Sequence, residues 1–509
     1  MTFAKIYSAQ INLLKAHLIS VEVDLTRGLH AFSIVGLPDK GIGESRDRVS
    51  SAIKNSGFKS PKQTNMKVVV SLAPADIRKE GPAFDLPIAL GYLSAVGELA
   101  INDNRWSRQI FVGELALDGT VRPVAGTLSF ARMAAENGFT EIFVPSDNAA
   151  EAAIIKNIKV FGVETLGQIV SHLRGKNLII ETGNSALIKK ISDGTKTIDR
   201  GVNLDDIAGH DNAKRALIIA AAGRHNIGLY GPPGTGKTML AKALQSIMPP
   251  LSASEMLEVT EIYSATSNVM DKARIGEKSG NHPPFRSPHH TSSYVSIIGG
   301  GGKTLRPGEI TLAHRGILFM DEFPEFDRKV LESLRQPLEE KHISISRAGG
   351  SEIFPADFIL IVAMNPCPCG KRDIKGKICT CSAADIARYK RKLSGPIVDR
   401  IDMWIEVSEM DYKKLISNKR GSEETDKARA IVEKSRSKFE TGLEPWKNQS
   451  VKMSPPARQI LEDSAAKYEL SGRGVHRVIK VAHTIASIES SEIVEAPHVL
   501  EALQYRQRI

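Results

Sequence analysis

The sequence contains no long apolar run, and this shortage excludes whole classes of protein. No stretch of about 18 apolar residues is present to cross a membrane, so we expect no membrane partner. The N-terminus also lacks an apolar run ending in small residues, which a secretory signal peptide requires. We therefore expect a cytoplasmic chain, in which structural disulfides are rare.

Cysteine is scarce, and the few cysteines are all in one place. Cys367, Cys369, Cys379 and Cys381 lie in the segment 365–382 of a 509-residue chain. Four thiolates in two C-x-C pairs are able to close a tetrahedral Zn²⁺ site. Zinc pairs are more often C-x-x-C, so a redox-active cluster and a cluster without a role stay open as alternatives. The pattern favours a structural zinc ion.

Composition and charge are those of a soluble globular protein with an anionic partner. Hydrophobic residues make up 41% of the chain, and the formal net charge is +10. The composition allows large cores, and the length predicts about three domains. A basic balance favours anionic partners such as nucleic acid, although it is weak evidence alone.

Apolar patterning divides the chain into blocks. Residues 1–173 combine strand-like runs with amphipathic helical stretches, which predicts an α+β domain. Residues 174–203 are polar and are interpreted as a linker. Strands and helices alternate over 204–400, as in a parallel α/β sheet, and 401–509 is one strand followed by helical sequence. In the first block the strands are expected at 17–25, 31–38, 66–74 and 109–117, and the helices at 44–58 and 85–99.

A glycine-rich turn joins an apolar strand at 226–230 to a helix. It fits G-x-x-x-x-G-K-[ST] in the context that a phosphate-binding loop demands, with Gly231, Pro232, Pro233, Gly234, Thr235, Gly236, Lys237 and Thr238. The glycines let backbone N–H groups turn toward one anion, and the helix N-terminus adds positive charge. We expect Lys237 to reach the terminal phosphates of ATP and Thr238 to bind Mg²⁺.

Two further strands end in polar residues that suit the same chemistry. Asp321 and Glu322 follow the apolar run 317–320, and we expect Asp321 to hold the Mg²⁺ and Glu322 to polarise the attacking water. Asn365 ends the strand FILIVAMN, where it would orient that water or sense the γ-phosphate. Arg400 just precedes a fourth apolar strand, and a late helix carries Arg473 and Arg477 opposite an apolar face.

In order, GPPGTGKT, FMDE, MNP, VDR and SGR resemble the Walker A, Walker B, sensor 1, arginine-finger and sensor 2 motifs of AAA+ ATPases. An insert at 250–315 and a hairpin expected over 338–358 resemble the magnesium-chelatase/MCM-like branch. More narrowly, FRSPHH, RPGEITLAHRGILFMDE and NPCPCG resemble the ComM/YifB family over nearly the whole chain.

The resemblance implies a P-loop AAA+ core with a parallel sheet. An α+β Lon-protease-like (ribosomal S5-like) domain precedes this core, and a C-terminal α-helical lid follows it. It also implies a hexameric DNA-dependent ATPase that uses ATP and Mg²⁺ to drive branch migration in recombination of incoming DNA, with a recombinase as a further partner. Arg400 would act as an arginine finger on the neighbouring subunit's ATP. Arg473 would be sensor 2, with Arg477 as the alternative.

Basic residues surround the cysteine pairs. Between Gly370 and Lys392 there are eight basic residues and two acidic ones. Such a loop suits a phosphate backbone, and a single tyrosine among them argues against base stacking. The candidate DNA contacts are Lys371, Arg372, Arg388, Lys390, Arg391 and Lys392, with Arg347 at the tip of the expected hairpin. His289 and His290 lack carboxylate or cysteine neighbours in sequence, so we assign them no metal and regard them as candidate DNA or interface residues.

The first block resembles the proteolytic domain of Lon without its catalytic pair. Ala83 stands where that family has its serine, and Leu128 stands where it has the activating lysine. An ATP-dependent protease is therefore disfavoured. A magnesium-chelatase-type ATPase subunit remains an alternative that shares the ATPase core, and we expect such a subunit to lack both the Lon-like block and the cysteine pairs.

Overall fold

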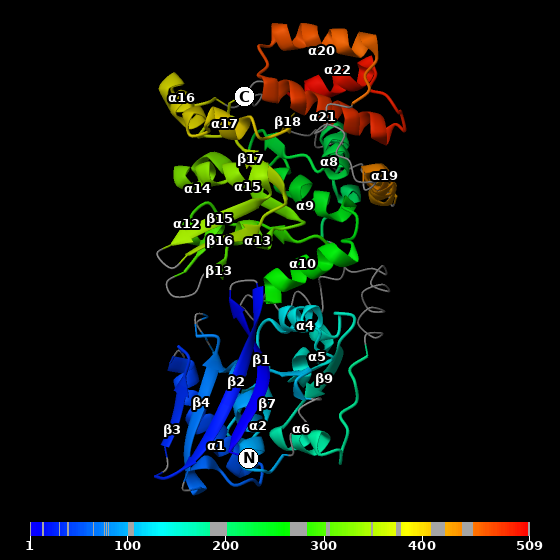
Figure 1. Ribbon diagram of the computed structural model, residues 1–509. Helices are drawn as coiled ribbons and strands as arrows, with labels where there is room; N and C mark the ends of the chain where they lie inside the picture. Colours follow the sequence, from blue (N-terminus) through cyan, green and yellow to red (C-terminus); the bar gives the residue numbers. More distant parts are fainter. Residues whose placement is uncertain are drawn as a thin grey trace. The chain divides into compact units, whose positions relative to one another are not determined.

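A computed structural model describes residues 2–506, except 13–14, 30, 38–39, 65, 76, 78, 80, 100–105, 184–200, 265–281, 302–305, 348–349, 373–377, 409–422 and 440–450 (Figure 1). The chain forms two compact units. Unit 1 comprises residues 1–195 with 260–280, and unit 2 comprises 196–259 with 281–509. The boundary at 195–196 lies inside the segment interpreted as a linker. Across the described ranges, no helix is long and apolar enough to span a bilayer.

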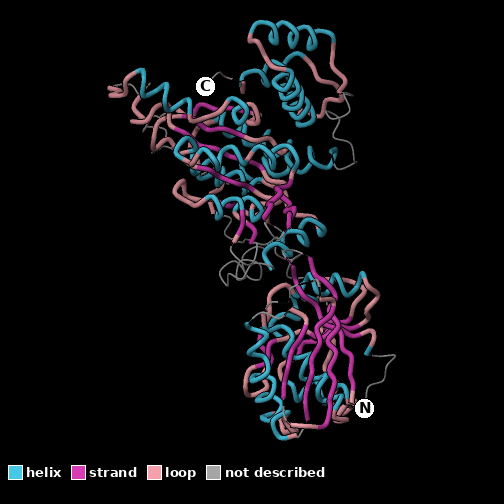
Figure 2. The backbone as a smooth tube through the Cα atoms, turned by 60° about the vertical axis from the view of Figure 1, so that its left-hand side comes forward, coloured by secondary structure: helices cyan, strands magenta, loops and turns pink. Residues whose placement is uncertain are grey.

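Unit 1 is built on a mixed seven-stranded sheet, drawn in magenta in Figure 2. The order is β3-β4-β2-β1-β5-β8-β9, with β2 antiparallel to both β1 and β4 and the remaining neighbours parallel. The strands are β1 (Phe3–Asn12), β2 (Lys15–Arg27), β3 (Ala31–Val35), β4 (Met66–Ala73), β5 (Gln109–Phe111), β8 (Glu141–Pro145) and β9 (Lys159–Val163); β6 (Glu114–Leu115) and β7 (Val121–Arg122) form a hairpin.

Helices cover both faces of this sheet. They are α1 (Lys40–Asn55), α2 (Asp85–Ala95), α4 (Thr127–Glu136), α5 (Ser146–Ala152) and α6 (Leu166–Leu173), with short 3₁₀ turns η1 (Pro61–Gln63) and η2 (Pro82–Phe84). Neighbouring residues of β5 alternate between the two cores, because Ile110 packs with α4 and α5 while Phe111 packs with α1 and α2. The predicted α+β fold of this block is confirmed. Strands β1, β8 and β9 were not among the strands expected from the sequence.

The positions that matched the Lon protease pair hold side chains without catalytic groups. Ala83 lies in η2, just before α2, and Leu128 is fully buried in α4. Neither a methyl group nor an isobutyl group supplies a nucleophile or a base.

Unit 2 contains a five-stranded parallel sheet in the order β11-β14-β17-β10-β18. The strands are β10 (Ile227–Tyr230), β11 (Phe285–Arg286), β14 (Ile317–Met320), β17 (Ile359–Met364) and β18 (Met403–Glu406). Strands β14 and β17 are buried at every position, as expected for a sheet covered on both faces. The predicted parallel α/β core is confirmed, and β18 continues it beyond residue 400, where we had placed its end.

Helices and short elements surround this sheet. They are η3 (Leu204–Asp206), α8 (Asp211–Gly223), α9 (Lys237–Ile247), α10 (Ala253–Ser264), α12 (Tyr294–Ile298), β12 (Gly299–Gly300), β13 (Arg306–Pro307), α13 (Glu309–Leu312), η5 (Phe323–Glu325), α14 (Arg328–Ser333), α15 (Arg335–Glu340), α16 (Ala383–Arg391) and α17 (Gly395–Val398). The expected hairpin is confirmed as β15 (His342–Arg347) paired with β16 (Gly350–Pro355).

The C-terminal helices share a core with the sheet. They are α19 (Glu424–Phe439), α20 (Pro455–Lys467), α21 (Gly472–Ile488) and α22 (Ala496–Gln504). The predicted apolar face of α21 is confirmed, because Val478, Ala482 and Ile485 are buried against α8 and the sheet. Burial of this stripe attaches the lid helices to the unit that carries the phosphate loop.

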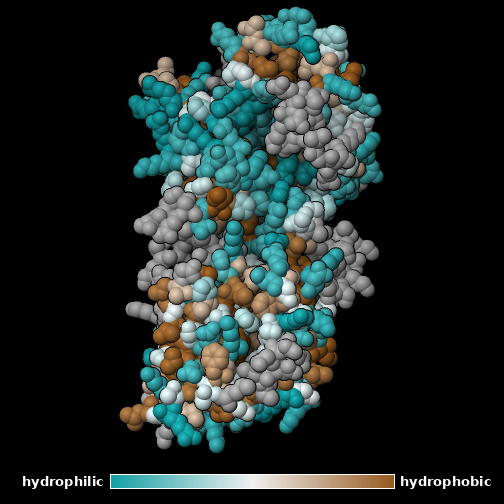
Figure 3. Space-filling view, in the orientation of Figure 1, coloured by the Kyte–Doolittle hydropathy of each residue, from teal (hydrophilic) through white to brown (hydrophobic). Residues whose placement is uncertain are grey.

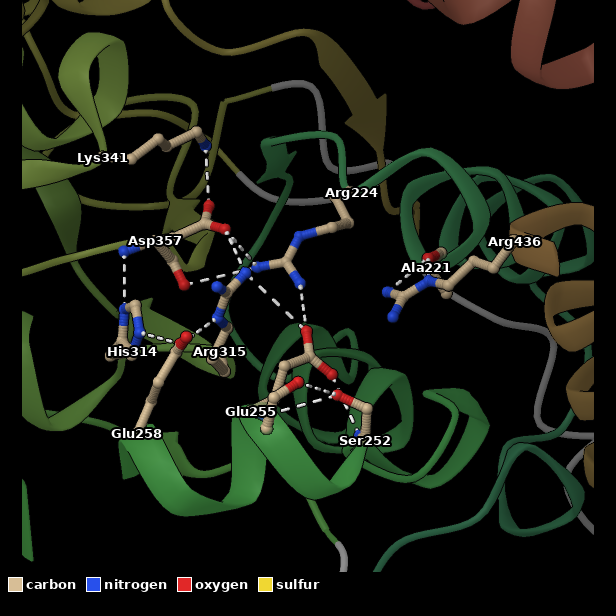
Figure 4. Close-up of polar contacts among 11 residues, drawn as sticks. Ala221, Arg224, Ser252, Glu255, Glu258, His314, Arg315, Lys341, Asp357 and Arg436 are labelled. Atoms are coloured by element: carbon tan, nitrogen blue, oxygen red, sulfur yellow. Dashed lines mark hydrogen bonds and ion pairs between the residues drawn. The ribbon is translucent and has the colours of Figure 1, made fainter. Parts of the chain in front are cut away.

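An ionic network anchors helix α10 to the sheet end opposite the phosphate loop (Figure 4). Asp357, just before β17, pairs with Arg224 at 3.2 Å, Arg315 at 3.1 Å and Lys341 at 3.1 Å. Arg315 also donates from Nε to Glu258 of α10 over 2.8 Å. Burial alone would raise the pKa of Asp357, but the nearby cations, Arg224 first, lower that pKa to about 2. The carboxylate is therefore ionised wherever unit 2 is folded at ordinary pH.

We predict that Asp357→Asn destabilises unit 2 by about 2 kcal/mol at neutral pH, because a carboxylate whose pKa lies at about 2 instead of 3.8 is lost. A depressed carboxyl pKa stabilises the fold above the unfolded value near 4, and that stability disappears as pH falls toward 2. The difference between variant and wild type should shrink over that range. Urea unfolding followed by circular dichroism checks this, with Asp463→Asn on the exposed face of α20 as control. Equal shifts in both variants would contradict the assignment.

Candidate functional site

The phosphate loop leaves the end of β10 and enters helix α9 as the motif predicts. Gly234 and Gly236 adopt positive φ values of 81° and 89°, which favour glycine. The Lys237 ammonium donates to the carbonyl oxygens of Gly231 and Pro232, each over 2.7 Å. Burial lowers the pKa of Lys237, and the nearby charge of Asp321 opposes that shift. The loop is thus folded around its lysine, with backbone carbonyls holding the ammonium.

A hydroxyl and a carboxylate lie together at the start of α9. Thr238 Oγ1 is 3.1 Å from Asp321 Oδ2, and Asp321 directly follows the last residue of β14. Hydroxyl and carboxylate oxygens are ligands that Mg²⁺ accepts beside nucleotide phosphates. These two residues therefore fit the predicted magnesium site.

Asn365 is brought to the same loop by strand pairing. Tyr230 at the end of β10 pairs with Met364 at the end of β17, and the N–H of Gly231 donates to the Met364 carbonyl over 3.2 Å. Asn365 Oδ1 accepts a hydrogen bond from Lys237 Nζ over 3.3 Å. The structure thus places the predicted sensor amide at the phosphate loop.

Glu322 follows Asp321 and is held by a histidine that the sequence did not assign to this site. Its backbone has a φ of 52°, and its N–H donates to Asp321 Oδ1 over 2.9 Å. Its carboxylate lies 3.1 Å from His290 Nδ1, and the rings of His289 and His290 are 4.2 Å apart. The paired histidines in SPHH stood out in the sequence as candidate functional residues. Their neighbours in the sequence, however, give no indication that His290 contacts Glu322.

Two of the predicted arginines share one carboxylate. Arg400 is only 6% exposed and pairs with Glu339 of α15 at 2.6 Å, while Arg473 reaches the same oxygen at 3.5 Å. The Arg400 guanidinium holds the pKa of Glu339 below its usual value. Among the described residues, neither arginine makes a polar contact with Lys237. The structure therefore joins the predicted finger to the predicted sensor 2 through Glu339, which sequence reasoning did not identify.

Arg477 has a different partner from Arg473. Its Nη1 lies 2.6 Å from Oδ1 of Asp402, which is buried ahead of β18 and also accepts from the N–H of Asn226 over 2.8 Å. Burial would raise the pKa of Asp402, but Lys480 and then Arg477 lower it overall. Arg477 therefore fastens α21 to the sheet, whereas the Arg473 side chain on the same helix is 63% exposed.

The four cysteines converge, and the basic residues cluster beside them. All four Sγ atoms lie within 4.8 Å of one another. The candidate DNA residues Lys371, Arg372, Arg388, Lys390, Arg391 and Lys392 are exposed around this loop and along α16. Lys392 pairs with Glu325 at 2.7 Å. Arg347 ends strand β15, but its side chain lies outside the described residues, as do Lys375 and Lys377.

Three family profiles match in succession. Residues 21–148 match "Subunit ChlI of Mg-chelatase", residues 203–415 match "Magnesium chelatase, subunit ChlI", and residues 422–506 match its C-terminal profile. The chain is 39% identical to Competence protein ComM of Haemophilus influenzae, over 100% of this chain and 98% of that protein. The chain belongs to the ComM/YifB family. YifB of Escherichia coli, described as uncharacterized, is 38% identical over 96% of this chain and 94% of its own.

The ComM/YifB chain is thus a magnesium-chelatase-like AAA+ ATPase. A Magnesium-chelatase 67 kDa subunit of Chlorobaculum tepidum is 26% identical over only 32% of this chain and 23% of that protein. The match at 21–148 carries a chelatase-subunit description. The N-terminal block therefore does not separate the two kinds of protein as we expected, whereas full-length identity does.

We predict that Arg400→Ala lowers ATP turnover by about 10³-fold or more and leaves nucleotide binding nearly intact, as for loss of an arginine finger. Steady-state ATPase and fluorescent-nucleotide binding measure the two effects. Arg215→Ala is the matched control, because Arg215 is likewise an arginine paired with carboxylates, those of Glu489 and Glu501, although its side chain is half-buried where that of Arg400 is buried. Unchanged turnover in Arg400→Ala would remove that residue from the mechanism.

Proposed function

We propose that this AAA+ ATPase is a hexameric DNA motor that uses ATP hydrolysis to drive branch migration in recombination. The observation that carries the proposal is the junction between the ATPase centre and a basic surface. Lys392 at the end of α16 pairs with Glu325, three residues beyond Glu322. A polyanion that engages α16 thus acts within one turn of the residue proposed to activate water.

The proposed roles at the centre follow from the chemistry of the side chains. Lys237 would neutralise the terminal phosphates, and Thr238 with Asp321 would hold the Mg²⁺. Glu322 positions the attacking water as a general base, and Asn365 orients it. The contact from His290 holds the Glu322 carboxylate away from the attacking water until that contact breaks. Arg400 acts on the ATP of the neighbouring subunit in a ring, and Arg473 acts on phosphate as sensor 2. To reach phosphate, both arginines would give up their ion pairs with Glu339.

The surface around α16 suits a DNA backbone better than an apolar partner. Its exposed lysines and arginines present several cations, and the face of unit 2 seen in Figure 3 is mainly hydrophilic. Tyr389, the tyrosine of this helix, is buried and is therefore not available to stack on bases. Binding through phosphates alone is independent of sequence and strongly weakened by salt.

Two alternative functions have less support. A magnesium-chelatase-type subunit shares the ATPase core, but the match to the chelatase 67 kDa subunit covers only 32% of this chain. An ATP-dependent protease would need a nucleophile where Ala83 stands and a base where Leu128 stands. The DNA-motor proposal keeps a role for the basic helix that neither alternative needs.

The experiment that tests the proposal is an ATP-dependent branch-migration assay on a three- or four-stranded DNA substrate. We expect strand exchange with wild type and ATP, and ATPase stimulation by forked DNA but not by casein or porphyrin. Stimulation by porphyrin alone would favour the chelatase-type alternative. Absence of strand exchange together with DNA-insensitive ATPase would overturn the proposal.

We predict that Glu322→Gln abolishes turnover and branch migration while ATP binding persists, because the amide cannot accept the proton of water. The matched control is Glu462→Gln, which removes an exposed carboxylate from α20, outside both the nucleotide site and the basic helix. Wild-type turnover in Glu322→Gln would contradict its assignment.

We predict that the double change Lys390→Ala and Arg391→Ala weakens DNA binding equally for all sequences. The slope of log K against log salt should fall by about 1.5, for two lost phosphate contacts. Fluorescence anisotropy at several salt concentrations measures this. The control is Lys427→Ala with Lys434→Ala, which removes an exposed basic pair from α19. Equal loss in both variants would show non-specific attraction only.

A further inference from the structure

The four cysteine sulfur atoms form one small cluster, in which all lie within 4.8 Å of one another. Cys367 Sγ lies 3.5 Å from that of Cys369 and 3.7 Å from that of Cys379, and the Cys369–Cys379 separation is 3.6 Å. Zn–S bonds of about 2.3 Å place thiolates about 3.8 Å apart in a tetrahedral site. A disulfide would need about 2.05 Å. The sulfur atoms are therefore spaced for a shared ion and not for a covalent pair.

A backbone N–H group of one C-x-C pair points at a sulfur atom of the other pair. The N–H of Cys369 donates to Cys381 Sγ over 3.4 Å. Such donors stabilise thiolates and orient them toward a metal. The backbone of the first C-x-C pair thus contacts the sulfur of the second, so the two pairs are already held together.

The cysteine loop also touches the phosphate loop and the sensor. Gly370, with a φ of 70°, donates its N–H to the Cys367 carbonyl, so the turn that follows the first pair is tight. A Cβ added there would lie 2.8 Å from Cδ of Pro233 and 3.9 Å from Cγ of Asn365. The N–H of Asn365 donates in turn to the hydroxyl of buried Tyr389 on α16. The loop is thus packed between Walker A, sensor 1 and the basic helix.

We propose that Cys367, Cys369, Cys379 and Cys381 bind one Zn²⁺, which fixes this loop against Pro233 and Asn365 and so positions the ATPase centre. A tetrahedral set of four thiolates is typical of Zn²⁺ and of iron–sulfur centres. An iron–sulfur cluster inserts sulfide ions between its thiolates and needs a wider ring than these separations give. The positioning role rests on ATP hydrolysis at this site and does not depend on DNA.

Metal content and turnover test the two halves of the inference. Protein purified under reducing conditions should hold about one zinc per chain, Cys379→Ser with Cys381→Ser should lose it, and Thr380→Ala should keep it. Without zinc, kcat for ATP should fall about 10-fold. Zinc content below about 0.3 per chain in wild type would overturn the proposal, as would wild-type kcat in the zinc-free variant.

Gly370→Ala separates positioning from metal binding and from folding. It keeps all four cysteines and adds a methyl group against Pro233. We expect it to retain zinc and still lose kcat about 10-fold, with an unchanged far-ultraviolet spectrum. Wild-type kcat in this variant would refute the positioning role, even where the cysteine variant does not fold. None of these measurements uses DNA, so their failure is distinguishable from failure of the motor proposal.

Discussion

Parallel strand pairing is the constraint on which the site depends. Strand β17 lies between β10 and β14, and Tyr230 pairs with Met364 while Met320 pairs with Val362. Because parallel strands all end at one edge, the residues that follow them meet there without any longer-range instruction. Lysine, carboxylate and amide groups from distant parts of the chain therefore share a space a few ångströms wide. Each of these strands is hydrophobic at nearly every position because it is covered on both faces.

The cysteine loop lies at the same edge of the sheet, where it contacts the phosphate loop and joins the end of β17 to α16. The chain leaves β17 at Asn365, turns through the cysteines and enters α16, whose first turn is capped by Ser382 directly after Cys381. The segment that joins sensor residue Asn365 to the basic helix α16 contains all four cysteines, so the sulfur cluster lies within this connection. Any ion held there would stiffen that route, since a short cross-linked loop has few other conformations.

The sequence predicted those features whose chemistry is carried by neighbouring residues. The phosphate loop, the Asp321–Glu322 pair and the apolar stripe of α21 each have a local pattern with a physical meaning. Pairings between distant residues could not be predicted in this way. The segment SPHH does not predict the contact with Glu322, and the residues near Arg400 do not predict the contact with Glu339. Both contacts depend on how the insert and α15 pack. Strand β1 was missed for a different reason: small and polar residues interrupt its alternation, and its pairing with β2 decides its conformation.

Asp402 limits how the lid is able to move. Its carboxylate is buried and spans the first strand of the nucleotide fold, at Asn226, and helix α21, at Arg477. Separating α21 from the strand would leave the buried Asp402 carboxylate without its arginine partner, which is costly. The C-terminal helices should therefore not swing open as an independent flap. Movements at the nucleotide-binding edge of the sheet are instead transmitted to the C-terminal helices through the Asp402–Arg477 ion pair. The exposed side of α21, including Arg473, therefore moves together with the sheet.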